Sequence, residues 1–72
     1  MSRSCLVLIA NGSEEIETIS VVDALRRASI DVTLASVSDT LQVECSRGVK
    51  VVADTKLSDC TTDSFECIVL PG

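Results

Sequence analysis

Three aliphatic runs, set apart by polar segments, constrain what this chain can fold into more than any other feature of its sequence. They cover residues 4–10 (SCLVLIA), 30–37 and 67–70, and a helical pattern fills residues 14–28 between the first two runs. Aliphatic runs without polar alternation are typical of strands buried on both faces of a parallel sheet. A strand, a helix and a strand in this order predict a right-handed unit with two parallel strands, and therefore an α/β fold.

Capping residues predict where the helix begins and ends. Residues 11–13 (NGS) predict a tight turn after the first strand, and Ser13 is the expected N-cap. The helix is expected to end near Ala28, with Arg26 and Arg27 in its last turn, where positive charge complements the helix dipole.

The second half of the chain is less regular. Residues 43–46 and 49–53 are short extended runs on either side of residues 47–48 (RG), and they predict a small hairpin. Residues 55–64 are polar and predict a loop or a short helical turn.

One helix cannot cover both faces of such a sheet. A parallel sheet needs helices on both sides, so the second face would expose a large aliphatic patch, which monomers avoid. We therefore expect residues 1–72 to be the N-terminal part of a larger single domain, with the remainder absent or on another chain. A shortened protein and an obligate oligomer are the alternatives.

Composition excludes several classes of function. The net charge is −5 and Lys plus Arg number 6, without a basic patch, so nucleic-acid binding is not expected. No aliphatic run approaches the roughly 20 residues that a membrane-spanning helix needs. Residues 1–10 lead into a turn and an acidic helix, which favours a first strand over a secretory signal.

The cysteines favour a reducing compartment. The chain has 4 of them, none in a Cys-x-x-Cys pattern, and it has no His, so a zinc site is not expected. Cys5 and Cys67 fall in predicted central strands, where we expect buried thiols. The expected location is the cytoplasm, although an even cysteine count leaves disulfides open.

Glu17 is the candidate catalytic residue. At about 100° per residue it projects along the row of Val21, Ala24 and Ala28, and it follows the carboxyl end of a strand, where open α/β sheets place their ligands. Burial in that row would raise the pKa of a carboxyl group and suit it to general acid–base catalysis. The alternative is an ordinary first-turn glutamate at a helix N-terminus.

The turn before the helix disfavours other ligands. It has one glycine, Gly12, and neither a Gly-x-Gly-x-x-Gly pattern nor a P-loop lysine. Glu14, Glu15 and Glu17 would repel a phosphate at the helix N-terminus. A metal site of the receiver-domain kind would need an acid after the last strand, and residues 70–72 (LPG) supply none.

Several short motifs, in their order and spacing, carry a family resemblance. Residues 10–18 (ANGSEEIET), Asp23, residues 26–28 (RRA), residues 45–47 (CSR) and residues 68–72 (IVLPG) together resemble the opening of the ThiJ/PfpI family, in the subgroup of the Parkinson-associated protein deglycase. The resemblance covers essentially all 72 residues. It implies a flavodoxin-like three-layer α/β/α sandwich with a mostly parallel sheet, incomplete in this chain, and a homodimer.

The resemblance also implies roles for residues of the site. A glutamate at the position of Glu17 would be held protonated against a nucleophilic cysteine that lies beyond Gly72. Backbone near Gly72 would help to form the oxyanion pocket, and Gly12 would lie on the substrate side.

Three further positions carry implied roles at the dimer interface. Arg27 and Arg47 would line the approach to the site, and Cys45 would be a redox-sensitive thiol. No metal or organic cofactor is implied.

The implied activity belongs to the complete protein. It is that of a cysteine-dependent glyoxalase or protein deglycase acting on reactive carbonyls such as methylglyoxal, with a role in oxidative stress. These 72 residues alone are expected to be inactive. A redox-sensing chaperone without turnover and a PfpI-like peptidase or amidase are the alternatives.

Overall fold

A four-stranded parallel sheet forms the centre of the molecule. A computed structural model describes residues 3–71, with β1 at Ser4–Ile9, α1 at Glu15–Arg27 and β2 at Asp31–Ser36. β5 (Thr55–Lys56) and β6 (Cys67–Val69) complete the sheet, in the order β5-β2-β1-β6. The pairings of β1 with β2, β1 with β6 and β2 with β5 are all parallel, which confirms the expected α/β class.

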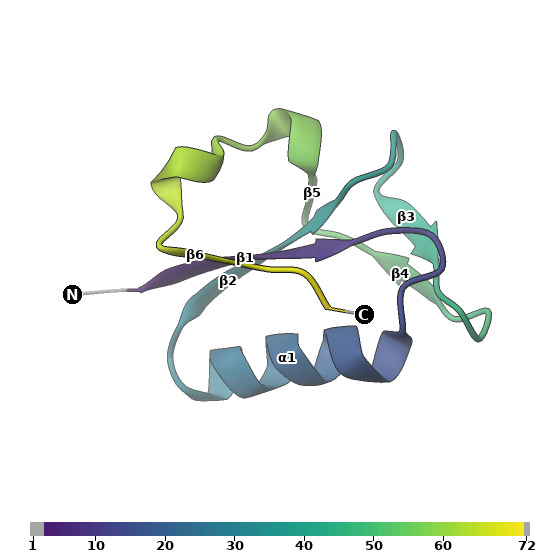
Figure 1. Ribbon diagram of the computed structural model, residues 1–72, viewed down its shortest axis with the longest axis horizontal. Helices are drawn as coiled ribbons and strands as arrows, with labels where there is room; N and C mark the ends of the chain where they lie inside the picture. The colour runs from purple at the N-terminus through teal and green to yellow at the C-terminus, as the bar shows by residue number, and fades with distance from the viewer. Residues whose placement is uncertain (1–2, 72) are drawn as a thin grey trace.

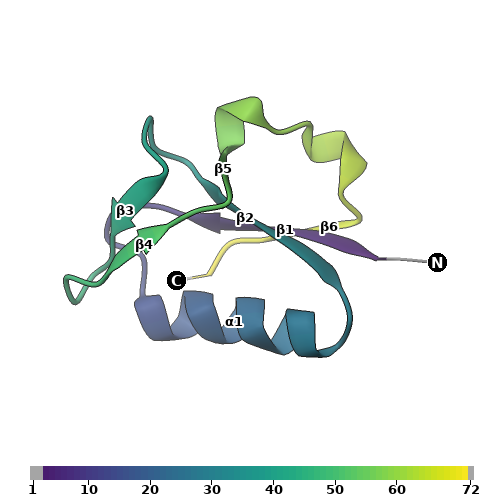
Figure 2. The ribbon, with the colours of Figure 1, turned by 180° about the vertical axis from the view of Figure 1, so that it is seen from behind.

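The two faces of the sheet are covered unequally. Figure 1 shows α1 on one side and, on the other, the segment with the short 3-10 helices η1 (Leu57–Asp59) and η2 (Thr62–Ser64). β3 (Gln42–Glu44) and β4 (Lys50–Val52) form a separate antiparallel hairpin, as expected. Seen from behind, this hairpin lies beyond the arrowhead ends of β1 and β2 (Figure 2).

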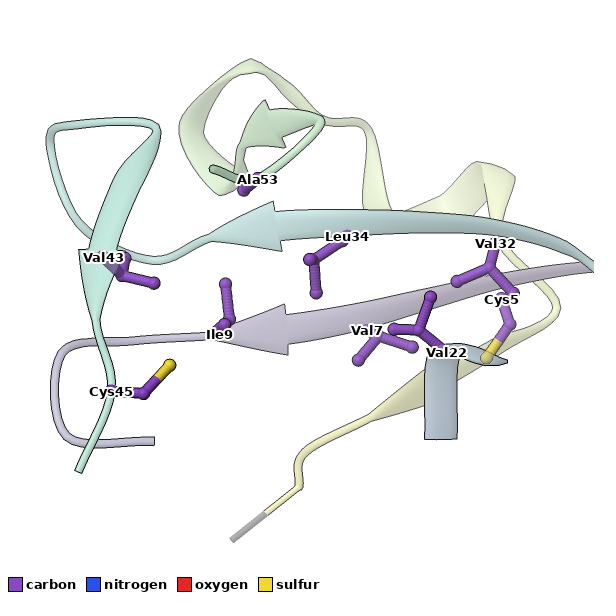
Figure 3. Packing of buried hydrophobic residues seen from close by; sticks show 9 residues of the cluster. All are labelled: Cys5, Val7, Ile9, Val22, Val32, Leu34, Val43, Cys45 and Ala53. Atoms are coloured by element: carbon purple, nitrogen blue, oxygen red, sulfur yellow. The ribbon is translucent and has the colours of Figure 1, made fainter. Parts of the chain in front are cut away.

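The main core lies between the sheet and α1 and continues under the hairpin. Alternate residues of β1 point into it, because successive side chains of a strand face opposite sides. Figure 3 shows how strand, helix and hairpin residues meet there: Cys5, Val7, Ile9, Val22, Val32, Leu34, Val43, Cys45 and Ala53. Each fully buried Val, Leu or Ile stabilises the fold by about 1.5–3 kcal/mol.

The opposite face of the sheet is only partly exposed. Leu6 and Ala35 are fully buried although they lie outside the main core, so the segment with η1 and η2 covers this part of the face. Ile68 is 48% exposed and Leu70 is 76% exposed. The expected aliphatic patch is therefore confined to the side of the sheet where β6 lies.

Two local expectations are wrong. Ser13 is not the N-cap: Glu14 is, and its carboxylate accepts a hydrogen bond from the Ile16 amide at 2.7 Å. The Ser13 hydroxyl instead accepts one from the Ala10 amide at 2.9 Å, which closes the turn. Cys67 is exposed rather than buried, because β6 is an edge strand among the described residues, whereas Cys5 is buried as expected.

Candidate functional site

The carboxyl ends of β1 and β6 meet at one edge of the sheet. Val7 pairs with Val69, so Pro71 is level with Ile9, the last residue of β1. The first turn of α1 follows a few residues later, and Glu17 is in that turn. The structure therefore places Glu17 and Pro71 at the same edge, where ligands bind in open α/β folds. Gly72 lies outside the described residues.

Three hydrogen bonds join the turn between β1 and α1, at residues 11–13, to the β3–β4 hairpin. The Gly12 amide donates to the Glu44 carbonyl at 2.9 Å, and the Glu44 amide donates to the Asn11 side-chain oxygen at 3.0 Å. The Ser46 amide donates to the Ser13 carbonyl at 2.8 Å. Gly12 has a φ of 89°, a conformation that favours glycine. Its amide is already bonded, so Gly12 contributes backbone shape at this edge and not a free oxyanion donor.

Glu15 is the buried carboxylate of this region, and the sequence did not single it out. Its side chain accepts hydrogen bonds from the Ser46 hydroxyl at 3.0 Å and from the Arg47 amide at 3.0 Å. The pKa of Glu15 lies below its ordinary value, chiefly because its own backbone amide donates to the carboxylate, and because Ser46, Arg47 and Val49 donate as well. These donors outweigh the opposing effect of burial. Glu15 is thus an ionised anchor for the 45–49 loop.

The expected burial of Glu17 is wrong for the described residues. Its side chain is exposed, and the helix turns Glu15, Thr18 and Val22 toward the sheet instead. Of the row predicted to be apolar, Val21 is half-buried and Ala24 and Ala28 are exposed. Within residues 3–71 the Glu17 side chain has no hydrogen-bond or ion-pair partner. Residues 3–71 therefore do not supply the apolar surroundings that the predicted catalytic role of Glu17 needs.

Neither Arg27 nor Arg47 forms an ion pair with Glu17 within residues 3–71. Arg27 is ten residues further along α1, about 15 Å away at 1.5 Å per residue, and it pairs with Asp23 at 3.0 Å. Arg47 is held through its backbone by Glu15, and its side chain is exposed. An interface role for either arginine stays a prediction.

Cys45 lies in the main core, under the hairpin. It is 4% exposed, and burial raises the pKa of its thiol, followed by the negative charges of Glu15 and Glu14. A buried thiol with a raised pKa is a poor nucleophile. Its redox role stays a prediction that would require the hairpin to open. Across residues 3–71, no group of three or more His, Cys, Asp or Glu side chains is placed to hold a metal ion.

Comparison with known proteins assigns the chain to a family. The model of the DJ-1/PfpI family, also called ThiJ/PfpI, matches residues 3–72. The chain belongs to the DJ-1/PfpI family.

Relatives in the DJ-1/PfpI family are close in sequence but longer. Drosophila melanogaster protein dj-1beta is 47% identical over 72 residues, which are 100% of this chain and 38% of that protein. The glutathione-independent glyoxalase DJR-1.2 of Caenorhabditis elegans is 37% identical over 71 residues, which are 97% of this chain and 38% of that protein. The chain thus spans well under half the length of these relatives.

Solved DJ-1 structures confirm the fold. The crystal structure of Drosophila melanogaster DJ-1beta matches with a TM-score of 0.94 at 47% identity, over 100% of this chain and 39% of that one. Toxoplasma gondii DJ-1 in an oxidised form matches with a TM-score of 0.95 at 46% identity, over 99% of this chain and 39% of that one. The described residues are therefore part of the flavodoxin-like sandwich of the DJ-1/PfpI family.

Proposed function

We propose that these residues form the acid–base half of a cysteine-dependent glyoxalase or protein deglycase, in a single domain that continues beyond Gly72. The observation that carries the proposal is the exposed Glu17 carboxylate at the edge where β1 and β6 both end. Unlike Glu15, Glu17 has no partner among residues 3–71 and is free to meet a further segment there. A relative at 37% identity is named as a glutathione-independent glyoxalase, which supports the assignment of this substrate class.

The chemistry needs a thiolate from the rest of the protein. The thiolate would add to the aldehyde carbon of methylglyoxal while the Glu17 carboxyl group gives its proton to the aldehyde oxygen, which forms a hemithioacetal. The Glu17 carboxylate would then take the proton from that carbon and return it to the neighbouring carbonyl carbon, while the hydroxyl proton moves to the oxygen of that carbonyl, which leaves a thioester of lactate. Water would hydrolyse the thioester, releasing lactate and the thiol. On a protein adduct, the same carboxyl group would protonate the departing amine.

The direct test is the conversion of methylglyoxal to lactate without glutathione. We expect lactate from the complete protein that carries these residues and none from residues 1–72 alone. Lactate formed by residues 1–72 alone would contradict the half-site proposal.

A redox-sensing chaperone without turnover is the principal rival. Absence of lactate from the complete protein, with client aggregation still suppressed, would favour that rival. Peptide or amide hydrolysis by the complete protein would instead favour a PfpI-like peptidase.

The cellular location and the oligomeric state of the protein stay predictions. No α-helix or 3-10 helix in residues 3–71 has the length and apolar character to cross a membrane. A cytoplasmic homodimer is proposed from the family resemblance, with Arg27, Arg47 and Cys45 near its interface. Size-exclusion chromatography with light scattering on the complete protein would test the dimer.

A further inference from the structure

A pair of thiols lies at the opposite end of the sheet from Glu17. Cys5 and Cys67 are directly paired residues of the neighbouring parallel strands β1 and β6. Their side chains point to the same face, and the Cys5 thiol donates a hydrogen bond to the Cys67 sulfur at 3.1 Å. We propose that Cys5 and Cys67 form a peroxide-reactive dithiol that closes reversibly to a disulfide. The proposal is independent of the activity proposed for Glu17.

The backbone geometry suits a disulfide. Neighbouring strands lie about 4.8 Å apart, inside the range of about 4.4–6.8 Å between the Cα atoms of bonded cysteines. The sulfurs must approach from 3.1 Å to about 2.05 Å. Side-chain rotation supplies this approach, so the strands need not separate or slide.

A hollow of about 230 Å³ gives a small oxidant access to the pair. Its lining combines both thiols with aliphatic and charged side chains: Arg3, Ser4, Cys5, Leu25, Ile30, Glu66 and Cys67. This volume is several times the roughly 30 Å³ that one water molecule takes in the liquid. A small hydroperoxide therefore fits in the hollow.

The two cysteines have different exposures and therefore different parts in the reaction. Within residues 3–71 Cys67 is the more exposed thiol and Cys5 is 2% exposed, and both line the hollow, so we assign the first reaction with the oxidant to Cys67. Burial raises the pKa of Cys5 to about 11, with a further contribution from the hydrogen bond to Cys67. Cys5 therefore waits as the protonated resolving thiol.

The proposed reaction consumes one hydroperoxide. The Cys67 thiolate attacks one peroxide oxygen, the O–O bond breaks, and the other oxygen leaves as an alcohol or water after taking a proton. Cys67 is then a sulfenic acid. The Cys5 sulfur attacks the Cys67 sulfur, the S–O bond breaks, and water leaves with the Cys5 proton. The two thiols are oxidised by two electrons and the peroxide is reduced by two.

The disulfide would tie the first strand of the sheet to the last one described. It would join residues 62 positions apart, and a link across such a long loop restricts the unfolded chain strongly. We therefore expect oxidation to raise the thermal unfolding midpoint of the protein, and reduction with a dithiol reagent to reverse the rise.

Peptide mapping after mild peroxide treatment tests the proposal. The purified protein is treated with one equivalent of hydrogen peroxide, its remaining thiols are alkylated, and it is digested without reduction by trypsin and a glutamate-specific protease. Because Glu66 lies between Cys60 and Cys67, these two cysteines fall in different peptides. We expect a linked Cys5–Cys67 peptide that disappears after reduction.

Matched variants separate the pair from the other cysteines. Cys67→Ser and Cys5→Ser are each expected to abolish the linked peptide and the rise in unfolding midpoint, and Cys60→Ser is expected to preserve both. If either single variant unfolds, capture of the native protein by an immobilised phenylarsenical, which needs two adjacent thiols, gives the same information before and after peroxide. A Cys67 that ends as a sulfinic acid, or that pairs with Cys60, would overturn the proposal.

Discussion

The carboxylate of Glu15 accepts a hydrogen bond from the backbone amide of Arg47 at 3.0 Å, which joins the first turn of α1 to the loop of the hairpin. The Ser46 hydroxyl binds the same carboxylate at 3.0 Å. With the bonds between the 11–13 turn and β3, this contact fixes the backbone around the carboxyl edge of β1. The frame that positions Glu17 is therefore complete within the described residues, although the proposed site is not.

Replacing Glu15 by Gln should destabilise the fold at neutral pH. The substitution removes the charge that strengthens the bonds from Ser46 and Arg47. The pKa of Glu15 is lowered from 4.5, so its contribution is fully present above pH 4.5 and is lost as the pH falls through the folded-state pKa. We expect a lower urea midpoint for the variant at pH 7, and a difference from wild type that shrinks below pH 4.5.

The same substitution at Glu17 is the control for that experiment. Glu17 is exposed and has no partner in residues 3–71, so Glu17→Gln should change the free energy of unfolding of this chain by less than about 0.5 kcal/mol. Equal destabilisation by the two variants would contradict the assigned difference between Glu15 and Glu17.

The raised pKa of Cys5 predicts that the fold loses stability at alkaline pH. Its pKa rises from 9.0 to about 11 in the folded chain, so the folded state keeps a proton that the unfolded state releases. The free energy of unfolding should then be constant below pH 9 with respect to this group and fall as the pH rises toward 11. Urea titrations at several pH values should show a shallower fall for Cys5→Ala. An unchanged slope in Cys5→Ala, or a shallower one in Cys60→Ala, would count against this assignment.

Core packing predicts that the same substitution costs more stability at Ile9 than at Ile16. Ile9 is 1% exposed in the main core, and Ile16 is 74% exposed at the start of α1. Ile9→Val should cost about 0.5–1.5 kcal/mol, because the lost methylene leaves unfilled space. Ile16→Val should cost less than about 0.5 kcal/mol. Chemical denaturation of both variants measures the difference, and comparable costs would show that the core is placed wrongly.

Asp54 should matter more than a typical surface acid. One of its oxygens accepts hydrogen bonds from the Leu34 amide at 2.9 Å and from Arg26 at 3.1 Å, which links α1 to β2 and to the residue before β5. Asp54→Ala should cost about 1 kcal/mol, chiefly through the bond to the Leu34 amide, because the half-exposed ion pair is screened by solvent. Asp23→Ala, which breaks only the exposed pair with Arg27, should cost less than about 0.5 kcal/mol. Equal costs would contradict the bridging role.

The strands and the helix could be predicted because their signals are local. The run of residues 4–10 has the aliphatic composition of a buried strand, and β1 occupies Ser4–Ile9. Short extended runs likewise predict the hairpin around residues 47–48, and β3 and β4 form it. β5 has no such signal, because Thr55–Lys56 is a two-residue strand with no aliphatic side chain.

The site could be predicted less well because its contacts are distant in sequence. Glu15 owes its burial to Ser46 and Arg47, 31 and 32 residues away, and nothing near Glu15 in the sequence signals this contact. The projection of α1 by angle placed Glu17 on the buried face, whereas packing against β1 and β2 turned Glu15, Thr18 and Val22 inward. The pairing of Cys5 with Cys67 likewise depends on strand register and not on spacing.

The most direct test of the account is the turnover of methylglyoxal by the complete protein with Glu17→Gln. Glu66→Gln, at the opposite end of the sheet, is the matched control. General acid–base catalysis typically contributes about 10²–10⁴-fold, so the account predicts that Glu17→Gln lowers kcat for lactate formation by at least about 100-fold while the protein stays folded. The control should keep wild-type turnover. Wild-type turnover in Glu17→Gln would contradict the account.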